Sequence, residues 1–241
     1  MGENRENEAL GKIVIVLILI AVAIIAAVYY ATHREITDPQ VLIAKTIAAS
    51  EDVKSYQFAF STNISIPEGD IEMMSSAGYV DYQNKEIRTT VRVMNRSLEM
   101  IVINDTAYVR ESYGSWQKPE LDEYYIWKSY DELEQQNSIL RNATNVTMHK
   151  DDEGWVLNVI PEREEVIAQM KRDGIVLGGG EELKNFTITY WIEKGSYYIT
   201  RIENNIELTM NIYGLLTPVK LKYCINLSDY NKKMEIDAPI I

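Results

Sequence analysis

The longest uninterrupted apolar stretch of the chain runs from Ile13 to Tyr30 and contains no charge, proline or side-chain amide. With Ala31 it is long enough, at about 1.5 Å rise per residue, to cross the hydrocarbon core of a bilayer as a helix. A buried core helix would carry polar positions on one side, and this segment has none. A cleaved signal peptide is the alternative, but its apolar part is shorter and ends in small residues rather than Tyr29-Tyr30. The pattern predicts an uncleaved transmembrane signal anchor over residues 13–31.

The anchor divides the sequence into a short amino-terminal part and one large domain. Residues 1–12 are polar and show no amphipathic pattern, which predicts a cytoplasmic stub without a function of its own. Residues 32–37 are a short linker, and residues 38–241 are long enough to bury a sizeable core. The domain is therefore expected to lie close to the bilayer surface.

Beyond the anchor, the spacing of apolar residues changes from helical to alternating. Asp38-Pro39 predicts the start of a helix that runs to about Ser50, with Leu42, Ile43, Ile47 and Ala48 on its apolar face. From Ser55 the apolar residues recur at every second position, as in a strand with one buried and one wet face. In this first strand the buried face carries Tyr56, Phe58, Phe60, Ile64 and Ile66.

Further alternating and helical segments follow in order. Strands are predicted over 71–83, 87–94, 98–103, 107–111, 145–150, 155–160, 186–192, 197–206 and 219–227, and helices over 129–140 and 161–173. The order predicts an α+β fold, in which an N-terminal transmembrane helix is followed by a single strongly curved antiparallel β half-barrel with about three packing helices.

Charge and cysteine content narrow the classes of function. Lys and Arg number 24 against 36 Asp and Glu, giving a net charge of −12. Such an acidic domain repels phosphate backbones, so nucleic-acid binding is not expected. The single cysteine, Cys224, permits no intrachain disulfide, which favours a prokaryotic surface over a eukaryotic secreted domain. Cys224 lies far from the anchor and is interpreted as an ordinary strand residue rather than a site of lipid attachment.

Seven N-x-S/T sequons indicate the side of the membrane on which the domain lies. They are centred on Asn63, Asn95, Asn104, Asn142, Asn145, Asn185 and Asn226. All seven follow the anchor, and they exceed the roughly two expected by chance, although a β protein rich in Asn, Ser and Thr accounts for some of them. We expect a single-pass protein of the cell membrane with a cytoplasmic N-terminus, an extracytoplasmic domain and glycans on some of these asparagines.

No combination of residues predicts catalysis, a metal site or a cofactor. His149 stands in a short polar strand without a recognisable nucleophile, and no HExxH, CxxC or GxSxG motif is present. Gly178-Gly179-Gly180 is followed by Glu181-Glu182 instead of a lysine and a helix, so a phosphate loop is not indicated. Asp151-Asp152-Glu153 lacks the spacing of a calcium loop and is interpreted as a charged turn.

Aromatic and aliphatic residues on the alternating strands are the strongest functional signal. A curved sheet covered by only a few short helices can leave part of its concave face open to an apolar ligand. The candidate lining residues of this cavity are Tyr56, Phe58, Phe60, Ile64, Tyr108, Ile188, Tyr190 and Tyr223.

Several local motifs, in this order, resemble the lipoprotein-carrier superfamily of half-barrels, the LolA and LppX type and its archaeal relatives. The motifs are Val53-Lys54-Ser55-Tyr56, Tyr108-Val109-Arg110 with Gly114-Ser115-Trp116-Gln117-Lys118, Tyr190-Trp191-Ile192-Glu193-Lys194 with Tyr197-Tyr198-Ile199, and Leu227-Ser228-Asp229-Tyr230-Asn231 with Ile236-Asp237-Ala238-Pro239. The resemblance covers residues 38–241 and implies a bent antiparallel sheet, closed by helices, that holds acyl chains. Carriers of this type are soluble or lipidated, whereas this chain is expected to be an archaeal-type membrane-anchored relative.

Two functions from different classes follow. The first is a membrane-anchored, non-enzymatic domain that binds a lipid or acyl chain in the half-barrel hollow. The alternative is a structural or adhesion module of a glycosylated cell surface, with no ligand; a hydrolase is a distant third because no nucleophile and base can be recognised. The membrane is an expected partner, and no protein partner can be named.

The sequons lead to a first testable prediction. Protein isolated from its native membrane should have an intact mass above that of the polypeptide, with the excess located by peptide mapping on some of the seven asparagines. An intact mass equal to that of the polypeptide would contradict glycosylation, while leaving the external location of the domain untouched.

Overall fold

The strands and helices of residues 38–241 form one of two units of the chain, the other being residues 1–37. The structure, a computed structural model, describes residues 36–104, 106–119, 132–172 and 176–240, together with Ile20 and Trp127. Among these residues no helix has both the length and the apolar character needed to span a membrane. Apart from Ile20, the predicted anchor lies outside the described residues, as do the stub and most of the linker.

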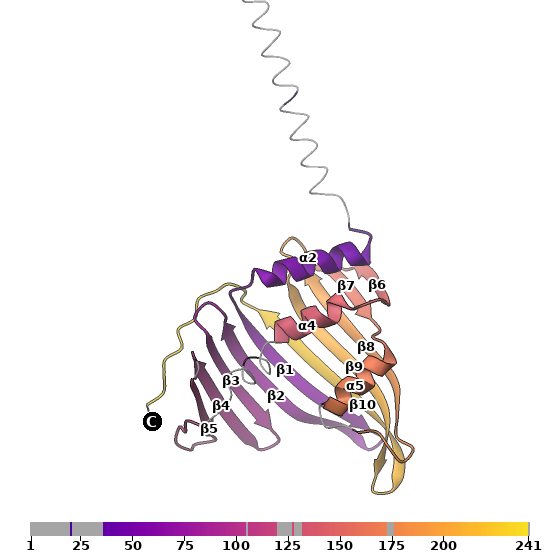
Figure 1. The fold of residues 1–241 in the computed structure, drawn as a ribbon. Helices are drawn as coiled ribbons and strands as arrows, with labels where there is room; N and C mark the ends of the chain where they lie inside the picture. The colour runs from indigo at the N-terminus through magenta and orange to yellow at the C-terminus, as the bar shows by residue number, and fades with distance from the viewer. Residues whose placement is uncertain are drawn as a thin grey trace, which may run out of the picture. The chain divides into compact units, whose positions relative to one another are not determined.

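Ten antiparallel strands form a single open sheet in the order β5-β4-β3-β2-β1-β10-β9-β8-β7-β6 (Figure 1). Their bounds are β1 Ser55–Ile66, β2 Gly69–Asp81, β3 Glu86–Val93, β4 Arg96–Ile103, β5 Thr106–Glu111, β6 Val146–Lys150, β7 Gly154–Val159, β8 Glu182–Glu193, β9 Ile199–Ile212 and β10 Leu215–Ser228. Every neighbouring pair in the sheet is consecutive in the sequence except β1 and β10. The predicted antiparallel sheet is thus confirmed, with β5 and β6 as its two edges.

Alternation gives the sheet two chemically different faces. In the β1–β10 register Phe60 pairs with Ile225 and Ile64 with Leu221, which places these apolar side chains on one face. The other face is charged: Glu203 forms ion pairs with Arg201 at 2.8 Å and with Lys222 at 3.0 Å. This pattern is typical of an antiparallel sheet that is covered on one side only.

Three helices in the described part of the chain cross the apolar face, which we call the helix side of the sheet (Figure 1). They are α2 Pro39–Glu51, α4 Glu132–Arg141 and α5 Arg163–Arg172. Helix α2 begins as predicted, because the carboxylate of Asp38 accepts a hydrogen bond from the backbone N–H of Gln40 at 2.9 Å and Pro39 opens the first turn.

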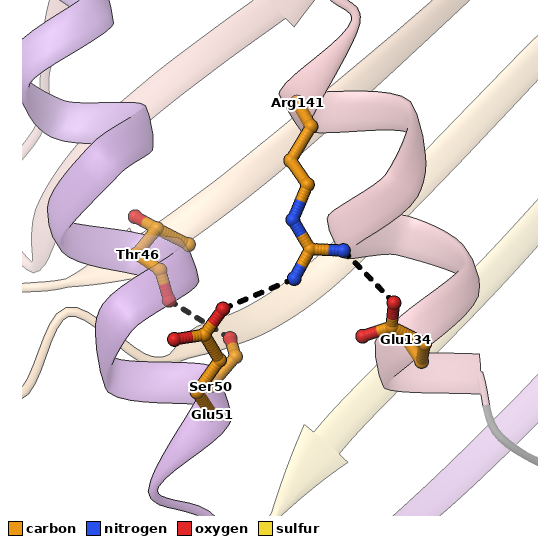
Figure 2. Close-up of polar contacts among 5 residues, drawn as sticks. All are labelled: Thr46, Ser50, Glu51, Glu134 and Arg141. Carbon is orange, nitrogen blue, oxygen red and sulfur yellow. Dashed lines mark hydrogen bonds and ion pairs between the residues drawn. The ribbon is translucent and has the colours of Figure 1, made fainter.

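The buried face of α2 differs from the predicted one. Leu42 and Ile43 are buried as expected, but Ala48 is exposed and the hydroxyl-bearing Thr46 and Ser50 are buried instead. Ser50 can be buried because its hydroxyl donates to the carbonyl of Thr46 at 2.9 Å (Figure 2). A pattern based on apolar residues alone misses such a position.

Helix α4 lies beside α2 and is connected to it by Arg141. The guanidinium of Arg141 contacts Glu51 of α2 at 3.1 Å and Glu134 of its own helix at 2.8 Å (Figure 2). Hydrogen bonds to Glu134 and then to Glu51 raise the pKa of Arg141 above its ordinary value. Because these groups are exposed, the bridge aligns the helices more than it stabilises them.

Burial and one internal hydrogen bond fix α4 on the sheet. Leu133 and Leu140 point inward as predicted, at 2% and 0% exposure. Between them, Gln136 accepts a hydrogen bond at 2.8 Å from the hydroxyl of Tyr190 in β8, and both side chains are buried.

Helix α5 is held on the sheet by a core cluster of apolar residues. Val166 and Met170 of α5 are buried there with Leu183, Ile206, Leu208, Val219 and Leu221. The predicted third apolar position of α5, Ile167, is 38% exposed.

The C-terminal segment returns over the opposite face of the sheet. Ile236 is buried against Tyr79 of β2 and Ile101 of β4. The hydroxyl of Tyr79 donates to the carbonyl of Lys232 at 2.7 Å, and Asn231 accepts from the backbone N–H of Lys54 at 2.7 Å. The motifs at 227–231 and 236–239 therefore hold the end of the chain on the outer face of β2–β4.

The C-terminal hairpin is longer than its sequence pattern indicates. Strand β9 continues to Ile212 rather than ending at residue 206, and β10 begins at Leu215 rather than at residue 219. The extra residues pair across a turn at Tyr213-Gly214, where both residues have positive φ. Proline cannot donate a ladder hydrogen bond, so Pro218 makes a strand appear unfavourable from the sequence. In the structure Pro218 nevertheless lies within β10, opposite Thr209.

A close approach between β1 and β2 leads to a stability prediction. Phe58 lies across from Gly78, and a Cβ at Gly78 would come within 2.5 Å of the carbonyl oxygen of Arg88 and 2.7 Å of the Phe58 ring. We expect Gly78→Ala to lower the free energy of unfolding by about 1–3 kcal/mol. Gly178→Ala, which meets nothing within 4 Å, is the control and should change it by less than about 0.5 kcal/mol. Equal denaturation midpoints for the two variants would contradict this packing.

Two buried tyrosines predict a loss of stability in alkali. Burial, reinforced by Glu132, raises the pKa of Tyr190 far above its ordinary value, and burial likewise raises that of Tyr230. The unfolded chain loses these protons from about pH 10, whereas the folded chain keeps them, so the contribution of the two tyrosines to stability is constant below that pH and falls above it. Each group should contribute a slope of about 1.4 kcal/mol per pH unit.

Replacing Tyr190 by phenylalanine measures its contribution to the alkaline loss of stability. Tyr190→Phe should make the alkaline slope shallower and, because Gln136 loses its donor, lower the free energy of unfolding by about 1–3 kcal/mol at neutral pH. Tyr213→Phe, at a fully exposed position, is the matched control and should leave the slope unchanged. Denaturation curves measured from pH 8 to pH 11 test both, and an unaltered slope in Tyr190→Phe would refute the assignment.

Candidate functional site

The predicted lining residues meet on the helix side of the sheet, with one exception. Strands β1, β8 and β10 place seven of them there: Tyr56, Phe58, Phe60, Ile64, Ile188, Tyr190 and Tyr223. The three deepest, Tyr56, Ile188 and Tyr190, are 0–1% exposed, whereas Phe58, Phe60, Ile64 and Tyr223 keep part of their surface exposed. The face therefore has a closed end and a partly open region.

The closed end is a cluster of tyrosines. The ring of Tyr56 lies 5.9 Å from that of Tyr82 and 6.2 Å from that of Tyr230. Tyr230 stacks on Tyr198 at 4.3 Å and donates its hydroxyl to the carbonyl of Ile199 at 2.5 Å. Rings in such contact fill the space between strand ends and the C-terminal segment, so this end serves packing rather than binding.

The partly open region lies toward the other end of β1 and β10. Phe60 and Tyr223 stack there with ring centroids 6.2 Å apart. Tyr223 packs against the buried cluster beneath α5, as do several other side chains along this face that remain partly exposed: Ile64, Ile66, Phe186, Met210 and Ile212. Partly exposed apolar surface next to a buried core is the chemistry that an acyl chain would contact.

Tyr108 lies on the opposite face of the sheet. In β5 it pairs with Ile101 and packs against the cluster of Tyr79, Ile101 and Ile236 beneath the C-terminal segment. Next to it, the guanidinium of Arg110 lies 4.6 Å from the ring centroid of Trp116 and binds Glu99 at 2.8 Å. The motif over residues 108–118 thus contributes to the outer surface and is separated from the helix side by the sheet.

Two residues of the helix side were missed in the sequence pattern. Thr62 follows Phe58 and Phe60 with the same spacing of two, and Asn204 stands between Ile202 and Ile206. Both therefore point to the helix side although neither is apolar. Assigning every second residue of each strand to the helix side would have found them, whereas a search for apolar residues does not.

The segments considered for chemistry occupy turns and exposed positions. Asp151 accepts hydrogen bonds from the backbone N–H groups of Glu153 and Gly154 at 3.0 and 2.8 Å, and His149 is exposed on β6. In the described part of the chain, no three His, Cys, Asp or Glu side chains lie close enough together to hold a metal ion.

The glycine-rich loop before β8 binds a carboxylate of its own chain. Glu181 accepts hydrogen bonds from the backbone N–H of Asn211 at 2.9 Å and from that of Gly178 at 3.1 Å. These bonds hold the pKa of Glu181 below its ordinary value. Glu181 thus ties the loop to the end of β9.

The sequon asparagines are mostly accessible. Six of them are exposed, namely Asn95, Asn104, Asn142, Asn145, Asn185 and Asn226, and Asn63 is partly buried on the outer face of β1. The side-chain amide of Asn142 donates to the carbonyl of Ser138 at 3.0 Å, so a glycan there would have to displace this bond. Attachment of glycans stays a prediction.

No family model and no curated protein sequence matches the chain. Similarity appears in three dimensions. The crystal structure of Mycobacterium tuberculosis lipoprotein LppX matches with a TM-score of 0.54 and 14% identity over 83% of this chain and 98% of that one. LprF from Mycobacterium bovis matches with a TM-score of 0.51 and 16% identity over 83% and 96% of the two chains.

A LolA superfamily protein from Nitrosomonas europaea aligns over 85% of this chain, but its TM-score of 0.28 is too low to support a common fold. The matches do not bear on an archaeal origin, which stays a prediction. The resemblance stated from the sequence motifs is confirmed at the level of fold: the described part of the domain shares the architecture of LppX and LprF.

Proposed function

We propose that the chain is a membrane-anchored, non-enzymatic domain outside the cytoplasm that binds the acyl chain of a lipid in the hollow of a half-barrel. One observation carries the proposal: apolar side chains around Phe60 and Tyr223 stay partly exposed on the face that the helices cover. Exposed apolar surface is costly in water, and burying it against an acyl chain releases about 25 cal/mol per Å².

Three further observations support it. The fold is shared with LppX, which is itself named a lipoprotein. The charged side chains of β9 and β10, such as Arg201 and Lys222, lie on the outer face and leave the helix side apolar. The apolar segment over residues 13–31 would hold the domain within a short linker of the bilayer, so the lipid would be taken from or delivered to that membrane.

A structural or adhesion role is the second candidate. Six exposed sequon asparagines distributed over the domain and a net charge of −12 favour a hydrated, glycan-covered surface. This role requires no lipid, and the two candidates therefore differ in what copurifies with the protein.

Lipid content of the purified protein tests the proposal. The full-length chain, extracted from its membrane and examined by native mass spectrometry and lipid extraction, should carry about one acyl lipid per domain. Phe60→Glu places a carboxylate in the partly open region and should lower the bound lipid at least tenfold, because burying an unpaired charge is strongly unfavourable.

The matched control is Ser61→Glu, the neighbouring residue on the opposite face of β1, which should retain the lipid. Wild-type protein that neither carries nor takes up lipid would overturn the proposal and leave the structural role. Equal lipid content in the two variants would show that the lipid is bound elsewhere.

A further inference from the structure

A row of polar side chains crosses the middle of the helix side. At the helix-side positions of four strands, over residues 56–66, 186–192, 202–212 and 219–227, the side chains are apolar or aromatic except at Thr62 and Asn204. Thr62 pairs with Tyr223, and Tyr223 pairs in turn with Asn204. The two polar residues therefore flank one tyrosine; we call Thr62, Tyr223 and Asn204 the polar row.

Two oxygens of the polar row are buried without a hydrogen-bond partner. Thr62 is 8% exposed, and neither its Oγ1 nor Oδ1 of Asn204 has a partner in the described part of the chain. Folded proteins pair the large majority of such atoms, because an unpaired buried acceptor loses its water without compensation. Two of them in one row of an apolar face point to a group that is supplied from outside the chain.

The spacing and polarity of the polar row indicate which chemical groups an external ligand would need. Adjacent strands are about 4.8 Å apart, so the backbones of Thr62 and Asn204 are separated by about 10 Å, with Tyr223 between them. Oδ1 of Asn204 can only accept, so its partner must donate; the hydroxyl of Thr62 can donate to a carbonyl. A ligand that suits both carries a hydroxyl and a carbonyl within this distance.

The charges and apolar side chains near the polar row further limit the class of ligand that it suits. The cationic side chains of β9 and β10, Arg201, Lys220 and Lys222, pair with Glu203 and Glu207 on the other face. An anionic head group at the polar row would therefore meet no counter-charge from these strands. Along the strands the row is flanked on one side by Phe60 and Ile225 and on the other by Ile64 and Leu221. Hydrocarbon can thus lie on both sides of the polar group.

Building on the proposed function, we propose that the polar row binds the uncharged glycerol group of a diacylglycerol. Its free hydroxyl donates to Asn204, an ester carbonyl accepts from Thr62, and its acyl chains lie on the apolar positions to either side. The proposal adds to acyl-chain binding a preference for the head group.

Photolabelling with three probes that share their acyl chains tests this preference. The full-length chain in phospholipid nanodiscs is exposed to a photoactivatable diacylglycerol, to its O-methyl ether, which cannot donate, and to the corresponding phosphatidic acid. Labelled peptides of β1, β9 and β10 are then quantified by mass spectrometry. The diacylglycerol should label at least fivefold more than either other probe.

Substitutions in the polar row test whether it causes the preference for diacylglycerol. Thr62→Val and Asn204→Leu remove the unpaired oxygens and should lower diacylglycerol labelling at least fivefold, to the level of the methyl ether. Their thermal midpoints should not fall, because no internal hydrogen bond is lost. The matched controls are Thr209→Val and Asn205→Leu on the outer face of β9, which should keep the preference. Thr62→Val, nearly equal in shape to the native residue, gives the result even where Asn204→Leu folds poorly.

Each outcome decides a different claim. Equal labelling of these strands by all three probes, or stronger labelling by phosphatidic acid, would overturn the role of the polar row while acyl-chain binding stands. Unchanged discrimination in both Thr62→Val and Asn204→Leu would also overturn it. Absence of labelling by every probe would overturn the proposed function and this inference together.

Discussion

The pairing of β1 with β10 is the constraint on which the rest of the domain depends. It joins residues from opposite ends of the sequence, Gln57 with Ser228 through Ser65 with Lys220. Without it the remaining pairings would leave two separate groups of five strands, β1–β5 and β6–β10. Closing so long a loop adds little entropy cost beyond that of a shorter one, because the cost grows only logarithmically with length. The ladder and its apolar face can therefore hold the two halves as one sheet.

The same pairing determines the chemistry of both faces. Side chains alternate with a period of two, so a shift of one residue between β1 and β10 would move Phe60 and Ile64 to the charged face. In the observed register the helix side collects Phe60, Ile225 and the polar row, while Lys222 and Glu203 meet outside. The C-terminal segment beyond β10 then reaches Tyr79 and Ile101, which fixes the outer face of β2–β4.

The helices divide the covered face into regions with different roles. Helix α4 is fixed by buried leucines and by the Tyr190–Gln136 hydrogen bond, close to the tyrosine cluster that closes one end. Helix α5 covers β8–β10 through Val166 and Met170, and beside it apolar side chains stay partly exposed. The acyl chain of the proposed function would lie in the less tightly covered region, beside the closed end.

Much of this domain could be predicted from the sequence, because the determining interactions are local. Alternation over residues 55–66, the Asp38-Pro39 helix start and the inward leucines of α4 are encoded within a few residues of one another, and the structure confirms each. The LppX-like fold was likewise recognisable from the order of short motifs. Seven of the eight predicted lining residues also share one face, since parity within a strand is a local property.

Other features depended on contacts between distant segments. The place of Tyr108 beneath Ile236 and the extension of β9 and β10 around Pro218 were decided by neighbours that the local pattern does not contain. The polar row is the clearest case. Thr62, Tyr223 and Asn204 are each unremarkable in their own strands and meet only through two strand registers. Sequence determined which residues alternate, and tertiary pairing decided which of them lie side by side, because register between strands far apart in the chain is set by the packing of the whole face.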